Sequence, residues 1–182
     1  MAWYEHLKQY STSSYDYPGT SYFIESPNFQ VSPGGSRNIN QIVIHITGGH
    51  SISESSAINQ FLKKAQSAHY IVNRQGVIVQ MVRDQNIANH IRKMKYHVSQ
   101  HSIGIEHVNT WLPGNKQHPT SIQYQASAAL VRWLCKRYGI PKIHSPNPHT
   151  SGIKGHIEAD PQSGHTSCPN PAWDWNHYVG LL

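Results

Sequence analysis

One apolar run constrains what this chain can fold into more than any other feature of its sequence. Residues 41–47 read Gln-Ile-Val-Ile-His-Ile-Thr and are followed directly by Gly48 and Gly49. A run rich in β-branched residues that is bounded by glycines is typical of a buried strand. We therefore expect a β-sheet with a strand from this run in its interior.

Other segments predict more strands and one long loop region. Residues 69–73 and 77–82 are apolar runs on either side of Asn-Arg-Gln-Gly, which predicts a β-hairpin. Residues 102–108, Ser-Ile-Gly-Ile-Glu-His-Val, predict a further strand. Residues 141–172 are rich in Pro, His, Ser and Gly, so we expect a long loop region there.

Helices are predicted between these strands and at the end of the chain. Residues 53–64 and 120–138 both place apolar side chains at helical spacing. Gly139 and Pro141 are expected to end the second helix, because glycine favours the left-handed cap and proline cannot continue a helix. A short helix is also expected within residues 174–182.

The length of the chain bounds its organisation. A chain of 182 residues can form one domain of ordinary size but is too short for two enzyme domains of ordinary size. Because no repeat or linker is visible, we predict a single α/β domain with a central mixed β-sheet flanked by helices. Residues 1–40 are expected to form an N-terminal helix and a lead-in segment packed on this domain, which spans residues 41–182.

The charge of the chain favours an anionic partner. Lys and Arg number 15 against 9 Asp and Glu, for a formal net charge of +6, which suits nucleic acid or an acidic cell-wall glycan. No block of basic residues and no nucleic-acid-binding motif is present, so we expect no nucleic-acid partner. The sequence also shows no signal peptide or membrane span, which predicts a cytosolic protein or one carried across a membrane by other means.

The 14 histidines outnumber the carboxylates, which suggests metal or proton chemistry. His45 lies inside the first apolar run, where burial requires partners for its nitrogens. His156 follows Gly155, and Cys168 comes twelve positions later. Two imidazoles and one thiolate leave one coordination position of zinc open, as in catalytic sites.

The sequence alone leaves other interpretations of these histidines open. His97 and His101 are spaced as neighbours on a helix, and Glu158 and Asp160 follow His156 closely enough to be ligands. A histidine-rich chain can also simply have a polar surface, and His45 can be a hydrogen-bonded core residue without a metal.

Glu106 is the other informative position. It is a lone carboxylate in an otherwise apolar strand, and beside a metal it would suit a general base acting on water. The alternative is that strand alternation turns Glu106 toward solvent.

Several motifs together resemble one enzyme family. The chain is similar over about residues 40–178 to the zinc-dependent N-acetylmuramoyl-L-alanine amidases, which include phage endolysins, bacterial wall-recycling amidases and peptidoglycan recognition proteins. Any one of these motifs is weak by itself, but six in order are specific. The matching segments are 42–47, 67–76, 77–82, 102–106, 155–156 and 166–169.

The resemblance implies a role for each matching residue. The family's three zinc ligands fall on His45, His156 and Cys168, and its catalytic acid and base falls on Glu106. Thr166 lies two positions before the third ligand, where family members place a Lys or Thr that assists the polarised carbonyl.

Substrate-binding positions follow from the resemblance less directly. His90 corresponds to a family histidine expected near the substrate, although Asn89 stands where the family has Trp. His69 on the hairpin is expected at the substrate or packed behind the site, and His165 could supply a positive charge where other members have Lys. Ala68 stands where the phage and animal branches have a catalytic Tyr, so proton transfer is assigned to Glu106 alone.

The implied activity is hydrolysis of the amide between N-acetylmuramic acid and L-alanine of peptidoglycan. One zinc ion would activate water, with Glu106 moving the proton. The alternatives are a non-catalytic peptidoglycan-binding module and a zinc peptidase that cuts within the stem peptide.

The biological context is open among three settings. A phage lysin, a delivered antibacterial toxin with an immunity protein and a cytosolic recycling enzyme all fit. We expect a monomer that acts on the cell wall or in the periplasm after lysis or delivery, and otherwise a cytoplasmic enzyme.

Overall fold

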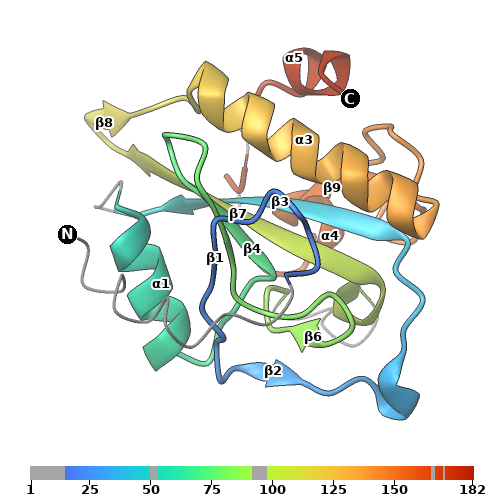
Figure 1. The fold of residues 1–182 in the computed structure, drawn as a ribbon. Coiled ribbons are helices and arrows are strands. Elements are labelled where there is room, and N and C mark those ends of the chain that lie inside the picture. The colour runs from blue at the N-terminus through green and yellow to red at the C-terminus, as the bar shows by residue number, and fades with distance from the viewer. Residues whose placement is uncertain (1–14, 50–52, 92–97, 165–166, 170) are drawn as a thin grey trace.

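A computed structural model describes residues 15–49, 53–91, 98–164, 167–169 and 171–182. It contains a sheet with helices packed on it, as Figure 1 shows. The strands are β1 (Tyr22–Phe23), β2 (Phe29–Gln30), β3 (Gln41–Gly48), β4 (Tyr70–Val72), β5 (Ile78–Gln80), β6 (Ile87–Ala88), β7 (Ser102–Leu112), β8 (Asn115–Lys116) and β9 (Gly152–Gly155). The helices are η2 (Pro33–Gly35), α1 (Glu54–Lys63), η3 (Ser99–His101), α3 (Ser121–Tyr138), α4 (His156–Ala159) and α5 (Trp175–Gly180).

The main sheet is mixed and has β3 in its interior. Its strand order is β1-β5-β4-β7-β3-β9, with β8 paired to the end of β7. β3 runs parallel to both neighbours, β7 and β9, whereas β4 and β5 form the antiparallel hairpin that the sequence predicts. The first six residues of β3 are buried, which confirms the buried strand.

Helices cover both faces of this sheet. Side chains of α3, such as Leu130 and Leu134, pack with Ile42, Ile44 and other alternate strand residues. Strand side chains that point to the opposite face pack against α1. Ile71 of β4, for example, belongs to the same apolar cluster as the buried residues of α1. Successive strand side chains point to opposite faces, so the two clusters lie on either side of the sheet. The predicted fold class is confirmed.

The long predicted helix has the ends that its sequence predicts. The side chain of Thr120 accepts a hydrogen bond from the Gln123 backbone N–H and caps the first turn of α3. Gly139 follows in the left-handed conformation, with φ of 67°, and closes the helix. None of the helices in the described ranges is long and apolar enough to cross a membrane.

Residues 141–172 are not one long loop, and this part of the prediction is wrong. They contain β9 and the single turn α4, and β9 forms an edge of the main sheet. The sequence signal of β9 is weak because Ile153 is its only large apolar residue. Lys154 is nevertheless buried, since its Nζ donates to the carbonyl oxygens of Asn147 and Thr150.

Part of the lead-in segment joins the sheets. β1 pairs parallel with β5 at the edge of the main sheet, and β2 pairs with β6 in a small second sheet. Residues 1–14, where the expected N-terminal helix would begin, lie outside the described residues.

Candidate active site

Three potential metal ligands converge where β3 and β9 lie side by side. Ile44 of β3 is in register with Gly155 of β9, so the next residues, His45 and His156, become neighbours. Their Nδ1 atoms are 3.1 Å apart, and the Cys168 Sγ lies 3.9 Å from the His45 Nδ1. One ligand atom from each of His45, His156 and Cys168 lies within 4.8 Å of the others.

These three residues fit a zinc ion in chemistry and in spacing. Imidazole nitrogen and thiolate sulfur are preferred zinc ligands, and three of them leave one position open. Burial raises the pKa of the Cys168 thiol well above its usual range, and the neighbouring Glu106 carboxylate adds to the effect. A thiolate is therefore costly here unless a cation offsets its charge, which a coordinated metal does.

Backbone contacts hold the loop of Cys168 against the turn of His156. The backbone N–H of Ile157 donates to the Cys168 carbonyl oxygen at 2.9 Å. Gly155 lies so close to Pro169 that a Cβ on Gly155 would be 2.5 Å from the Pro169 Cδ. The chain segments that carry His156 and Cys168, twelve positions apart in the sequence, are therefore packed tightly against each other.

Glu106 lies beside His45 on the same face of the sheet. The two residues are in register on the paired strands β7 and β3. Part of the Glu106 side chain remains accessible, but its Oε2 is buried and has no hydrogen-bond partner among the described residues. Burial raises the pKa of Glu106 to about 8. A carboxyl group with a pKa near neutrality is suited to take up and return a proton.

His90 lies directly behind His45. Its Nδ1 is 3.1 Å from the His45 Nε2, and its own Nε2 is 3.1 Å from the Ser102 hydroxyl. Burial lowers the pKa of His90 well below its usual range, so the ring is neutral and can accept a hydrogen bond. If His45 binds a metal through Nδ1, its Nε2–H donates to His90, an arrangement that fixes ring orientation in metal sites.

His69 is completely buried beside His90. Its Nδ1 accepts a hydrogen bond from the Gly104 backbone N–H, and its Nε2 is 3.1 Å from the Asn86 carbonyl oxygen. These are contacts of a packed residue behind the site. Direct contact of His69 or His90 with substrate stays a prediction.

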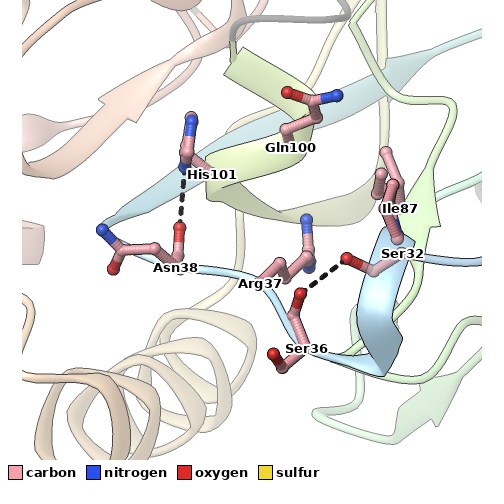
Figure 2. A pocket seen from close by; sticks show the side chains of 8 residues that line it. Ser32, Ser36, Arg37, Asn38, Ile87, Gln100 and His101 are labelled. Carbon is pink, nitrogen blue, oxygen red and sulfur yellow. Dashed lines mark hydrogen bonds between the residues drawn. The ribbon is translucent and has the colours of Figure 1, made fainter.

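The other sequence candidates are placed elsewhere or lie outside the described residues. Thr166, His165 and His97 belong to the latter group. His101 lies beside a cavity of about 190 Å³ that none of the three proposed ligands lines. Figure 2 shows its Nδ1 facing the Asn38 carbonyl oxygen, at 2.8 Å.

The strands and candidate ligands described above all lie within a segment that matches one known protein family. The model of the Amidase_2 family, N-acetylmuramoyl-L-alanine amidase, matches residues 35–171, which is more than half of the chain. The chain belongs to this family. No curated protein sequence matches this amidase.

Solved structures share the fold of this amidase. A selenomethionine derivative of AmpD is 23% identical, with a TM-score of 0.62, and the match covers 91% of this chain and 96% of AmpD. The endolysin LysCS from Clostridium intestinale is 17% identical, with a TM-score of 0.58 and coverage of 88% and 95%. AmiD from E. coli is 23% identical, with a TM-score of 0.58 and coverage of 82% and 60%.

Sequence reasoning about the amidase missed two supporting residues. Ser102 contacts His90 from behind, and His144 contacts Glu158 next to the His156 turn. Gly104 gave a usable signal that the His90 ring lies against the strand of Ser102, because a glycine inside a strand often marks close approach of another group. No signal in the sequence pairs His144 with Glu158, since they come from separate segments.

Gly104 is expected to tolerate no side chain in this amidase. A Cβ there would lie 2.5 to 2.8 Å from three atoms of the His90 ring. Gly104→Ala is expected to cost about 1–3 kcal/mol of unfolding free energy, because the buried ring must move. Gly180→Ala is the control, since a Cβ on Gly180 meets nothing within 4 Å. Urea unfolding compares the two variants, and equal stability would contradict this close packing.

Proposed function

We propose that the chain is a zinc-dependent hydrolase that cleaves the amide bond between N-acetylmuramic acid and L-alanine of peptidoglycan. One observation carries the proposal: His45, His156 and Cys168 converge beside the partly buried carboxyl group of Glu106. This combination supplies both a metal site and a proton acceptor on one face of the sheet.

The residues of the chain have separable tasks in this reaction. Zinc held by His45, His156 and Cys168 would supply a Lewis acid that polarises the amide carbonyl and acidifies water. Glu106 takes the proton from the attacking water and returns it to the leaving amine of L-alanine. His90 holds the His45 ring in place from behind, through the 3.1 Å contact between their nitrogens.

The nature of the substrate is supported by a structural neighbour and by charge. The AmiD structure is described as a complex with the substrate anhydro-N-acetylmuramic acid-L-Ala-D-γ-Glu-L-Lys. The net charge of +6 favours association with an anionic wall. We therefore propose that the chain acts as a wall-degrading lysin or as a delivered toxin. A toxin would have an immunity protein as its partner.

Metal removal tests the proposal against a non-catalytic binding module. The purified chain is expected to solubilise purified peptidoglycan, to lose this activity after treatment with a chelator and to regain it with added zinc. The measurement is the release of soluble wall fragments together with the amount of chain bound to the sediment. Binding without any release at every zinc concentration would favour the binding module.

A further inference from the structure

Glu158 makes contacts that the proposed reaction does not use. It lies two residues after His156, in the single turn α4, and its carboxylate bends back toward the start of that turn. Its Oε2 accepts the backbone N–H of Gly155 at 2.6 Å, and both of its oxygens lie 2.9 Å from the His144 Nε2. One side chain thus ties the residue before a proposed metal ligand to a separate segment.

His144 is itself held from two directions. Its backbone forms a bridge with Ile153 of β9, which fixes it beside the sheet edge that leads into His156. Its ring is stacked on Trp175, with ring centroids 3.9 Å apart and an angle of 6° between the planes. Stacking and a charge-assisted hydrogen bond together leave the imidazole little freedom.

Trp175 belongs to the C-terminal helix, which is anchored to the long helix α3. It is the first residue of α5, and Asp174 before it caps that helix by accepting the His177 backbone N–H. The backbone N–H of Asp174 donates to the Tyr124 hydroxyl of α3 at 2.8 Å. Residues close to the end of the chain are therefore connected by contacts to the turn of His156.

The turn that carries His156 needs such support. α4 has four residues, which is too short to be stable by itself, and its first backbone N–H groups have no partner within the helix. Metal ligands must be held within about 0.5 Å of their productive positions, and contacts from outside the ligand set supply that restraint.

We infer that Glu158, His144 and Trp175 form a clamp that positions His156 for metal binding, so that the C-terminal helix is part of the support of the active site. The clamp residues are positioning residues, because Glu158 is occupied by Gly155 and His144 rather than by the metal. The inference rests on the proposed zinc site.

Variants can separate this clamp from general stability. Glu158→Ala removes both hydrogen bonds and is expected to weaken zinc affinity by about 10- to 100-fold, the range typical of contacts behind metal ligands. Glu158→Gln keeps an oxygen for the Gly155 N–H and is expected to recover part of that affinity. His144→Phe keeps a flat ring on Trp175 and removes only the hydrogen bond, so it tests the clamp even if Glu158→Ala does not fold.

The readouts are zinc affinity, measured by competition with a chelator, and the absorption spectrum of the cobalt(II)-substituted protein. Both report on the ligands and do not follow stability alone. Glu25→Ala removes an exposed carboxylate from the lead-in segment. It is the control and is expected to leave both readouts unchanged. We expect weaker zinc binding and an altered cobalt spectrum in Glu158→Ala and His144→Phe.

Two results would overturn the inference in distinguishable ways. Wild-type zinc affinity and an unchanged cobalt spectrum in both folded clamp variants would overturn the clamp and leave the proposed function standing. A wild-type chain that binds no zinc would overturn the metal site of the proposed function and the clamp together.

Discussion

Replacing Glu106 by Gln is expected to lower kcat by about 10²- to 10⁴-fold while the protein retains its zinc. The amide has the shape of the carboxyl group but cannot take up a proton from water. Burial raises the pKa of Glu106 to about 8, so the native side chain can exchange protons near neutral pH. The measurement is the initial rate of fragment release from purified peptidoglycan, with zinc content determined on the same sample.

A matched variant makes this result specific. Glu25→Gln removes one carboxylate from an exposed position and is expected to keep wild-type turnover. Full activity of Glu106→Gln would show that another group moves the proton. Loss of zinc from that variant would instead make Glu106 a ligand, contrary to the proposed role of Glu106.

Replacing Cys168 by Ala is expected to weaken zinc binding by more than about 100-fold, because a direct ligand matters more than the contacts behind it. Its Sγ is one of three ligand atoms that lie within 4.8 Å of one another. Turnover is expected to fall with metal occupancy and to return in part at high zinc concentration. Zinc affinity is measured by chelator competition.

Cys135, the other cysteine, provides the control for this variant. It is buried in the core on the α3 side, and neither cysteine forms a disulfide. Cys135→Ala is expected to lower stability somewhat but to leave zinc affinity unchanged. Equal zinc affinity of the wild type and Cys168→Ala would remove Cys168 from the ligand set.

Local patterns in the sequence were sufficient for most of the fold. The apolar run at β3, the hairpin turn before Gly76 and the cap at Gly139 each carry a signal within a few residues. β9 has no comparable signal, because its two glycines and a lysine are acceptable only in this tertiary context. The lysine is satisfied by carbonyl groups of a neighbouring loop, which no local pattern can indicate.

The residues of the candidate site also divide into those with a local sequence signal and those without one. His45 and Glu106 stand out because each is a polar residue in an apolar strand. His90 is predicted only through the family resemblance and His144 not at all, because their partners come from other parts of the chain.

The simplest interpretation of the number of histidines was a polar surface. Several of these histidines are buried instead. His107, for example, lies 2.7 Å from the Ser127 hydroxyl, and burial lowers its pKa to about 4. Neutral buried imidazoles of this kind are structural parts of the core and its polar network. A count of histidines therefore says less about metal binding than the positions of two of them.

The bond that is cut distinguishes an N-acetylmuramoyl-L-alanine amidase from a peptidase. Purified peptidoglycan is digested with the zinc-loaded chain, and the soluble products are analysed by mass spectrometry. We expect intact stem peptides that begin with a free L-alanine amine, together with glycan whose lactyl groups carry free carboxyl groups. Shortened peptides, with L-alanine still attached to muramic acid, would contradict it and identify a peptidase.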